Sequence, residues 1–215
     1  MTPYPVALIV DIVKSRELVD RAGAQRDILT AFRAADDARN FREPLWATAG
    51  DEFQAVFDTA ADALRATAIA QLLLPDGLEC RFGLGQGEIT AVDAASEQSR
   101  IQDGPAWWVA RQAINEAHRR EDRSNPYLRT WFISAESADA ADAVINSYLL
   151  VRDQTISTMN ARQRRLAAGA LLGRSQSDLA KDEGITQSAV SQNLQRSGGA
   201  ALVAAHSVLD EVSAR

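Results

Sequence analysis

The stretch "VALIVDIV", residues 6–13, decides how the N-terminal part of this chain folds. It is a continuous apolar run rich in β-branched residues, which is typical of a central strand buried on both faces of a sheet. One acid, Asp11, interrupts the run. A carboxylate in such a strand is costly unless it is paired or bound to a metal. The sequence therefore predicts a central strand with an acidic site near its end.

The segments after this strand alternate between helical and extended patterns. The predicted helices cover residues 20–39, 59–74 and 105–119, and the predicted strands cover residues 79–90 and 127–134. Between the first two helices, "LWATA" and "FQAVF" flank a Gly-Asp pair, which predicts a β-hairpin. Residues 91–103 are polar and predict a loop. This order indicates an α+β sandwich of the ferredoxin-like type.

The bend of the hairpin carries a second carboxylate, Asp51. The predicted topology places the hairpin beside the first strand, so Asp51 approaches Asp11. Two such carboxylates can bind Mg²⁺, with phosphate oxygens of a nucleotide as the remaining ligands. Gly50 would let the chain turn and a phosphate approach closely. The alternative is that Asp51 only forms the turn and that backbone donors satisfy Asp11.

Three more residues are candidates for contact with a ligand. Arg81 in "CRFG" is either a phosphate contact or a charge at a strand edge. Trp107 and Trp108 lie in the helix that Pro105 opens, and they are either core residues or platforms on which a base stacks.

Four motifs in this part of the chain together resemble a known family. In order and spacing, "ALIVDIVKSREL", "TAGDEFQAVF", "RFGLGQGEI" and "GPAWWVARQAI" resemble class III nucleotide cyclase domains. The segment "AGDEFQ" is also similar to the "GGDEF" turn of diguanylate cyclases. The chain as a whole resembles the SatD family, which joins such a domain to a C-terminal helical segment. The resemblance to the cyclase domains covers residues 5–135 and implies that Asp11 and Asp51 are the two metal-binding aspartates.

The chain departs from the cyclase pattern at the residues that read the base and stabilise the transition state. Ala47 stands where adenine-selective cyclases carry lysine, and Trp107 and Trp108 stand where asparagine is expected. Arg111 is the candidate for the arginine of that helix. The resemblance therefore implies a nucleotide-binding domain without turnover. The alternative is a divergent Mg²⁺-dependent nucleotidyl cyclase.

A second pattern lies in "QSDLAKDEGITQSAVSQNLQ", residues 176–195. Gly184 tolerates positive φ at a turn, and Ser175 and Thr186 suit the N-caps of the helices before and after it. The part "AKDEGITQSAVS" resembles the helix-turn-helix motif of repressors of the phage lambda Cro type. A helix predicted over residues 161–172 would complete a three-helix core.

The second helix of this motif would enter the major groove of double-stranded DNA, where short and amide side chains read base edges. The predicted DNA-binding residues are Thr186, Gln187, Ser188, Ser191 and Gln192 on this helix, with Arg164, Arg165, Lys181 and Arg196 as phosphate contacts. The alternative is a helical hairpin that contacts only protein.

Composition limits the classes of protein to consider. The chain has 215 residues and a net charge of −6, so as a whole it is not a general nucleic-acid binder. Residues 158–215 nevertheless carry seven Lys and Arg against five Asp and Glu. The single cysteine, Cys80, excludes an internal disulfide and fits a reducing cytosol. The sequence predicts neither a signal peptide nor a membrane span.

These patterns lead to one expected function. We expect a cytoplasmic, homodimeric, DNA-binding transcriptional regulator that senses a nucleotide second messenger or NTP, held with Mg²⁺. The expected domains are a nucleotide cyclase-like sensor (1–135), a helical connector (136–157) and a helix-turn-helix DNA-binding domain (158–215). The alternatives are the divergent cyclase, with the C-terminal part as its localiser, and a protein-interaction adaptor that binds no nucleic acid.

Overall fold

A computed structural model describes residues 4–39, 41–48, 51–91, 102–121, 124–136 and 139–213. The strands are β1 (Val6–Ile12), β2 (Glu43–Ala47), β3 (Glu52–Phe57), β4 (Cys80–Gln86), β5 (Thr90–Ala91), β6 (Gln102–Asp103) and β7 (Thr130–Ser134). The helices are η1 (Ser15–Glu17), α1 (Arg21–Arg39), α2 (Ala60–Leu73), α3 (Pro105–Glu121), α4 (Asp139–Ser157), α5 (Ala161–Leu171), α6 (Gln176–Glu183), α7 (Gln187–Ser197) and α8 (Gly199–Ser213). The protein is therefore a mixed α+β fold with a helical C-terminal part.

Five strands form the main sheet in the order β2-β3-β1-β4-β7. β1 lies at its centre and pairs antiparallel with both β3 and β4, while β7 pairs parallel with β4. The hairpin of β2 and β3 has the position that the sequence predicted, beside the first strand. This arrangement brings the bend of the hairpin to the end of β1 that carries Asp11.

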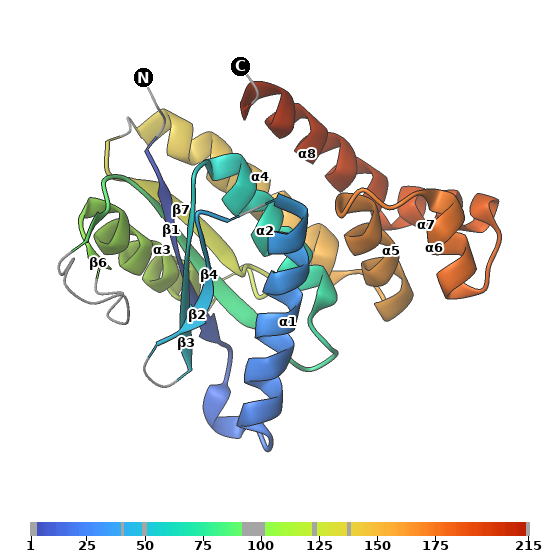
Figure 1. Cartoon of the computed structure of the whole chain (residues 1–215), viewed down its shortest axis with the longest axis horizontal. Helices are drawn as coiled ribbons and strands as arrows, with labels where there is room; N and C mark the ends of the chain where they lie inside the picture. The colour runs from blue at the N-terminus through green and yellow to red at the C-terminus, as the bar shows by residue number, and fades with distance from the viewer. Residues whose placement is uncertain are drawn as a thin grey trace.

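Alternate residues of β1 face two different layers. Val6, Leu8 and Val10 join the large core under α1 and α2. Ala7 and Ile9 join a smaller cluster with residues of α3 on the opposite face. Figure 1 shows the sheet between these two layers of helices. Asp11 shares the parity of Ala7 and Ile9, so it belongs to the α3 face of the sheet.

The outer edge of β7 is covered by side chains of α4. Asn146 accepts a hydrogen bond from the Phe132 amide and donates one to its carbonyl, at 2.9 and 2.8 Å. Asp142 accepts from the Ser134 amide, and Asp153 accepts from the Thr130 amide. These bonds satisfy backbone groups that an edge strand would otherwise expose to another strand.

The C-terminal helices pack against the N-terminal part mainly through α2, which contacts α5 and α8. Figure 1 shows α5, α6 and α7 gathered at one end of the molecule, with α8 returning along the body. Arg65 of α2 donates to the Leu171 and His206 carbonyls and pairs with Asp210. Within the described ranges, no helix is long and apolar enough to cross a membrane.

Most of the predicted elements are confirmed, and one region differs. The predicted helices appear as α1, α2, α3 and α5 with shifts of one or two residues at their ends. The segment predicted as one strand over residues 79–90 is instead β4 followed by β5, which pairs with β6. Residues 91–103, predicted as a loop, therefore begin and end in short strands, and 92–101 lie outside the described residues.

Candidate functional site

Asp11 lies between two strands that each place a charged residue beside it. In the sheet register Asp11 is opposite Glu52 of β3 and Arg81 of β4. Arg81 Nη1 donates to the Asp11 carboxylate at 3.4 Å, and Arg81 Nε donates to Glu121 at 2.6 Å. Arg81 is therefore held between two carboxylates, one on the central strand and one at the end of α3.

The surroundings of Asp11 shift the pKa of its carboxyl upward, which disfavours the ionised form. Burial raises the pKa of the Asp11 carboxyl above its usual value, and the negative charge of Asp51 raises it further, while Arg81 lowers it. The structure thus brings the two predicted carboxylates close enough for one to destabilise the ionised form of the other. A cation bound between them would relieve that repulsion.

The two aspartates are suited to a divalent cation only if a ligand completes its shell. Mg²⁺ prefers six oxygen ligands and is commonly held by one or two carboxylates together with phosphate oxygens. In the described part of the chain, no group of three or more His, Cys, Asp and Glu side chains could hold a metal ion, either at this site or at another. Asp11 and Asp51 alone would therefore leave most of the ligand positions of such a cation to other groups. Gly50, the predicted point of phosphate approach, lies outside the described residues.

A pocket of about 280 Å³ opens on the α3 side of Asp11. Its wall includes Asp11, Glu52, Arg81, Arg111 and His118. Arg111 reaches across from α3 and pairs with Glu52 at 2.7 Å. The pocket therefore holds two guanidinium groups beside two carboxylates. The guanidinium groups can bind an anion, and the carboxylates can bind the cation that accompanies it.

A second pocket, of about 390 Å³, lies by the end of β1 and the start of α1 and includes Asp51. Arg16, Arg21 and Ser15 also line it, and none of them was predicted as a site residue. Lys14, directly after β1, adopts a left-handed backbone conformation with φ 53°. Residues held in this way cluster at ligand sites. The basic residues that follow the first strand were the feature of the sequence from which this second pocket could have been predicted.

The structure separates the roles of the two adjacent tryptophans. Trp107 is 8% exposed and packs edge-on against Trp46, with ring centroids 6.1 Å apart. Trp108 is 58% exposed. Trp107 is thus part of the core between the sheet and α3, and Trp108 presents its ring at the surface.

The C-terminal motif folds as two helices joined by a short turn. α6 ends at Gly184, which has φ 63°, and α7 follows after two residues. Ser175 caps α6 by accepting the Asp178 amide, and Thr186 caps α7 by accepting the Ala189 amide. The predicted caps and turn glycine are confirmed, and they fix the angle at which α7 leaves α6.

The first turns of α7 carry a polar surface. Gln187, Ser188 and Gln192 are exposed, and Ser191 is half-buried. Val190 and Leu194, on the opposite face of the helix, are buried in the core. The structure therefore brings the predicted base-reading side chains to one outward face.

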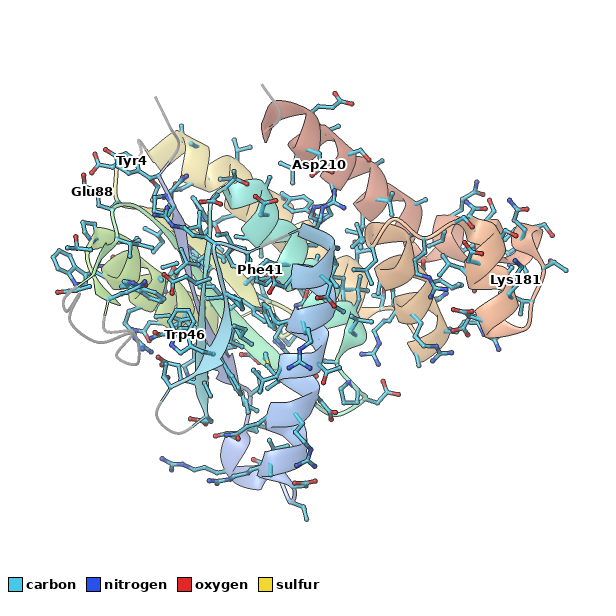
Figure 2. All side chains as sticks on the ribbon, in the orientation of Figure 1. Tyr4, Phe41, Trp46, Glu88, Lys181 and Asp210 are labelled. Carbon is cyan, nitrogen blue, oxygen red and sulfur yellow. The ribbon has the colours of Figure 1, made fainter. Side chains whose placement is uncertain are left out.

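The predicted phosphate contacts do not all lie together. Arg165 pairs with Glu183 at 2.6 Å, and Lys181 lies 3.8 Å from Asp178. Arg196 is exposed in the last turn of α7. Figure 2 shows Lys181 at the outer end of the C-terminal helices, far from Trp46 of the sheet.

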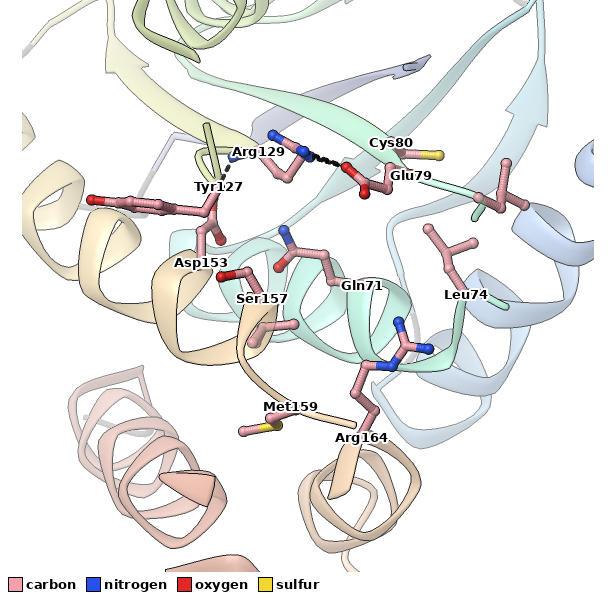
Figure 3. Close-up of a pocket in the computed structure, with 12 residues that line it drawn as sticks. Gln71, Leu74, Glu79, Cys80, Tyr127, Arg129, Asp153, Ser157, Met159 and Arg164 are labelled. Carbon is pink, nitrogen blue, oxygen red and sulfur yellow. Dashed lines mark hydrogen bonds and ion pairs between the residues drawn. The ribbon is translucent and has the colours of Figure 1, made fainter. Parts of the chain in front are cut away.

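Arg164 lies on a different side of the C-terminal helices. It pairs with Asp76, which follows α2, and it lines a pocket of about 150 Å³ between the sheet and α4. Figure 3 shows Arg164 below Gln71 of α2 and Leu74, the residue after α2, with Met159 beside it. The position of Arg164 is therefore suited to joining α5 to the N-terminal part of the chain.

One comparison with known proteins identifies a family. The family model described as "SatD family" matches residues 5–207, which is most of the chain. No curated protein matches.

Proposed function

This chain belongs to the SatD family, and we propose that it is a homodimeric, cytoplasmic regulator that binds double-stranded DNA and responds to a nucleotide. The observation that carries the proposal is the pair α6 and α7, joined at Gly184, with a polar face on the first turns of α7. In helix-turn-helix proteins this part of the second helix enters the major groove, and dimers read two half-sites.

The nucleotide half of the proposal depends on the end of β1. Support for a cyclase-like domain comes from the order β2-β3-β1-β4, in which each neighbour is antiparallel. Asp11 and Asp51 would hold Mg²⁺, which would neutralise phosphate charge. Arg16 and Arg21 beside Asp51, and Arg81 and Arg111 beside Asp11, would contact the phosphates.

The DNA prediction concerns the outward face of α7. Gln187→Ala or Gln192→Ala should weaken binding to a selected duplex by ~1–3 kcal/mol and relax preference at one position, because each removes a base contact. Arg196→Ala should weaken binding to all duplexes alike and reduce the salt dependence, because a phosphate contact carries no sequence information. The measurement is selection from a random duplex pool, followed by titration at two salt concentrations.

Gln154→Ala on α4 is the matched control, since Gln154 is an exposed glutamine outside α6 and α7. It should leave DNA affinity unchanged. If no duplex is enriched and low salt gives no binding, the regulator proposal fails and a protein-contact role for the helices takes its place.

The second prediction concerns the carboxylate pair. Asp51→Asn should remove most of the Mg²⁺-dependent gain in nucleotide affinity and should raise the melting temperature without metal, because it removes the negative charge that raises the pKa of Asp11. Calorimetric titration with and without Mg²⁺ measures the first effect, and thermal unfolding the second.

Asp58→Asn is the control for this experiment, because Asp58 is an exposed acid just after β3, the strand that Asp51 precedes. It should alter neither quantity. If Mg²⁺ raises nucleotide affinity equally in wild type and Asp51→Asn, Asp51 is not a ligand of the metal.

A second candidate function is a divergent Mg²⁺-dependent nucleotidyl cyclase, which the closeness of Asp11 and Asp51 favours. Ala47 and the two tryptophans oppose it, because they replace residues that cyclases use to read the base and stabilise the transition state. Incubation with each of the four NTPs and Mg²⁺ or Mn²⁺ separates the two functions. Cyclic or linked product above background would favour the enzyme.

A further inference from the structure

A fourth pocket, of about 450 Å³, lies beside the Asp11 pocket on the same face of the sheet. It lies between the start of α3 and the strands β1 and β3. Its lining residues are Ile9, Gln54, Gln102, Trp107, Trp108 and Arg111. Arg111 also lines the Asp11 pocket, so the two pockets adjoin at its side chain.

Trp107, which lines this pocket, has an indole N–H with no acceptor among the described residues. Trp107 is 8% exposed, and its buried Nε1 has no hydrogen-bond partner in the described part of the chain. Buried N–H groups are nearly always paired, because losing water without gaining a partner costs free energy. An acceptor that enters the pocket would satisfy this donor.

An unpaired acceptor lines the same pocket. Gln102 donates through Nε2 to Glu43, which fixes the orientation of its amide. Its Oε1 is buried and has no donor among the described residues. Two groups of the pocket lining, the Trp107 donor and the Gln102 acceptor, are therefore available to an occupant.

Trp108 supplies a flat surface at the mouth. Its ring is 58% exposed, but its Nε1 donates to the Asp103 carboxylate at 2.8 Å. This bond holds the indole in one orientation, so a planar ligand could stack on it with little loss of side-chain freedom.

From these contacts we infer that the pocket binds the base of a nucleotide, as a planar nitrogen heterocycle that presents an acceptor to Trp107 and a donor to Gln102. The inference rests on the proposed nucleotide binding. Adenine, for example, carries a ring nitrogen acceptor and an amino donor on one edge. The phosphates would then extend past Arg111 toward Asp11. Residues of α3 and β6 would thus recognise the base, and Ala47, which does not line this pocket, would not contact it.

The test uses the full chain and nucleosides, which lack the phosphates that the aspartates would need. Adenosine, guanosine, cytidine and uridine are titrated by calorimetry and by intrinsic fluorescence. At least one should bind and change the tryptophan emission. Trp108→Ala should weaken that binding by about 5- to 150-fold, the range for loss of one base–aromatic stack. Gln102→Leu should weaken it and shift the preference among the four.

Trp131→Phe is the matched control, because Trp131 lies on β7 under the Arg120 guanidinium, away from this pocket. It should leave nucleoside affinity unchanged. If a nucleotide with Mg²⁺ binds equally to wild type, Trp108→Ala and Gln102→Leu, the base lies elsewhere and only this inference falls. If neither nucleosides nor nucleotides bind, the proposed nucleotide function falls with it. Water bridging Trp107 and Gln102 then accounts for the pocket.

Discussion

Asp153→Ala is expected to lower the free energy of unfolding by about 3–5 kcal/mol, the usual result of leaving one charge of a buried pair without its partner. The Arg152 and Asp153 side chains are both 0% exposed and lie 2.8 Å apart. The Asp153 carboxylate also accepts from the backbone amides of Arg129 and Thr130, each at 2.8 Å. The substitution would therefore remove one ion pair and two backbone contacts at once.

Arg152 makes the loss severe, because its guanidinium connects three elements. It donates to the Leu64 carbonyl and the Thr67 hydroxyl of α2, at 3.1 and 3.0 Å, and to the Thr130 hydroxyl of β7. Small domains are stable by only ~5–15 kcal/mol, so this loss is a large part of the total. Urea unfolding measures it.

Two further variants make the result interpretable. Gln154→Ala changes the next residue of α4, which is exposed, and should have an effect within about 0.5 kcal/mol. Arg152→Met combined with Asp153→Leu should recover part of the loss, because apolar side chains need no partner. A loss below about 1 kcal/mol for Asp153→Ala would mean that water reaches the pair.

Local signals explain how much of the fold could be predicted. The β-branched run of β1, the hairpin bend, Thr59 as the N-cap of α2 and Gly184 at the turn each depend on residues close in sequence. Capping and turn formation are decided within about five residues, so a single sequence contains the information they need.

Contacts between distant segments explain what was missed. Arg164 was predicted to contact DNA phosphates, and its pairing with Asp76, 88 residues earlier, was not predicted. The segment 136–157, predicted as a helical connector, contains the helix α4, but the contact of Asn146 with the edge of β7 was not predicted. Both outcomes depend on which surfaces meet, which the spacing of residues along one segment does not contain.

The residues of the candidate site also divide into those that local sequence could predict and those that depend on contacts between distant segments. Asp11 and Asp51 could be paired from the predicted topology, because neighbouring strands bring their ends together. Gln102 could not be predicted, because its segment appeared to be loop and its orientation depends on Glu43, 59 residues earlier. The outward-facing polar residues of α7 were accessible to prediction because a helix presents its faces at a regular spacing.

The glycines of β4 give the other prediction with a large effect. The sequence showed "RFGLGQG" only as a strand interrupted by glycine. In the structure Gly83 and Gly85 alternate along the face on which α3 packs, with Ala106 and Ala110 against them. A Cβ on Gly85 would lie 2.1 Å from the Ala106 carbonyl oxygen and 2.3 Å from the Ala110 amide nitrogen. The helix therefore packs on the strand at a distance that no side chain permits.

Gly85→Ala is expected to destabilise the protein by about 3 kcal/mol or more, because the clash is with backbone and the whole of α3 must move. Gly169→Ala is the matched control. Its new Cβ would also lie close to a neighbour, 2.4 Å from Leu179 Cδ2, but that atom ends a flexible side chain. Alanine also favours the helix by ~1 kcal/mol over glycine, so this control should be neutral or slightly stabilising.

The displacement of α3 should be visible at the candidate site as well as in stability. Trp107 and Arg111 both lie on α3, so in Gly85→Ala the tryptophan emission should shift to longer wavelength and nucleotide affinity should fall. Urea unfolding and fluorescence of the folded variant measure the two effects separately. Wild-type stability in Gly85→Ala would mean that α3 does not rest on β4, and the pockets between α3 and the sheet would then have a different shape. A loss of stability together with a change in the environment of Trp107 would establish that Gly85 sets the depth at which this helix, with Trp107 and Arg111, lies on the sheet.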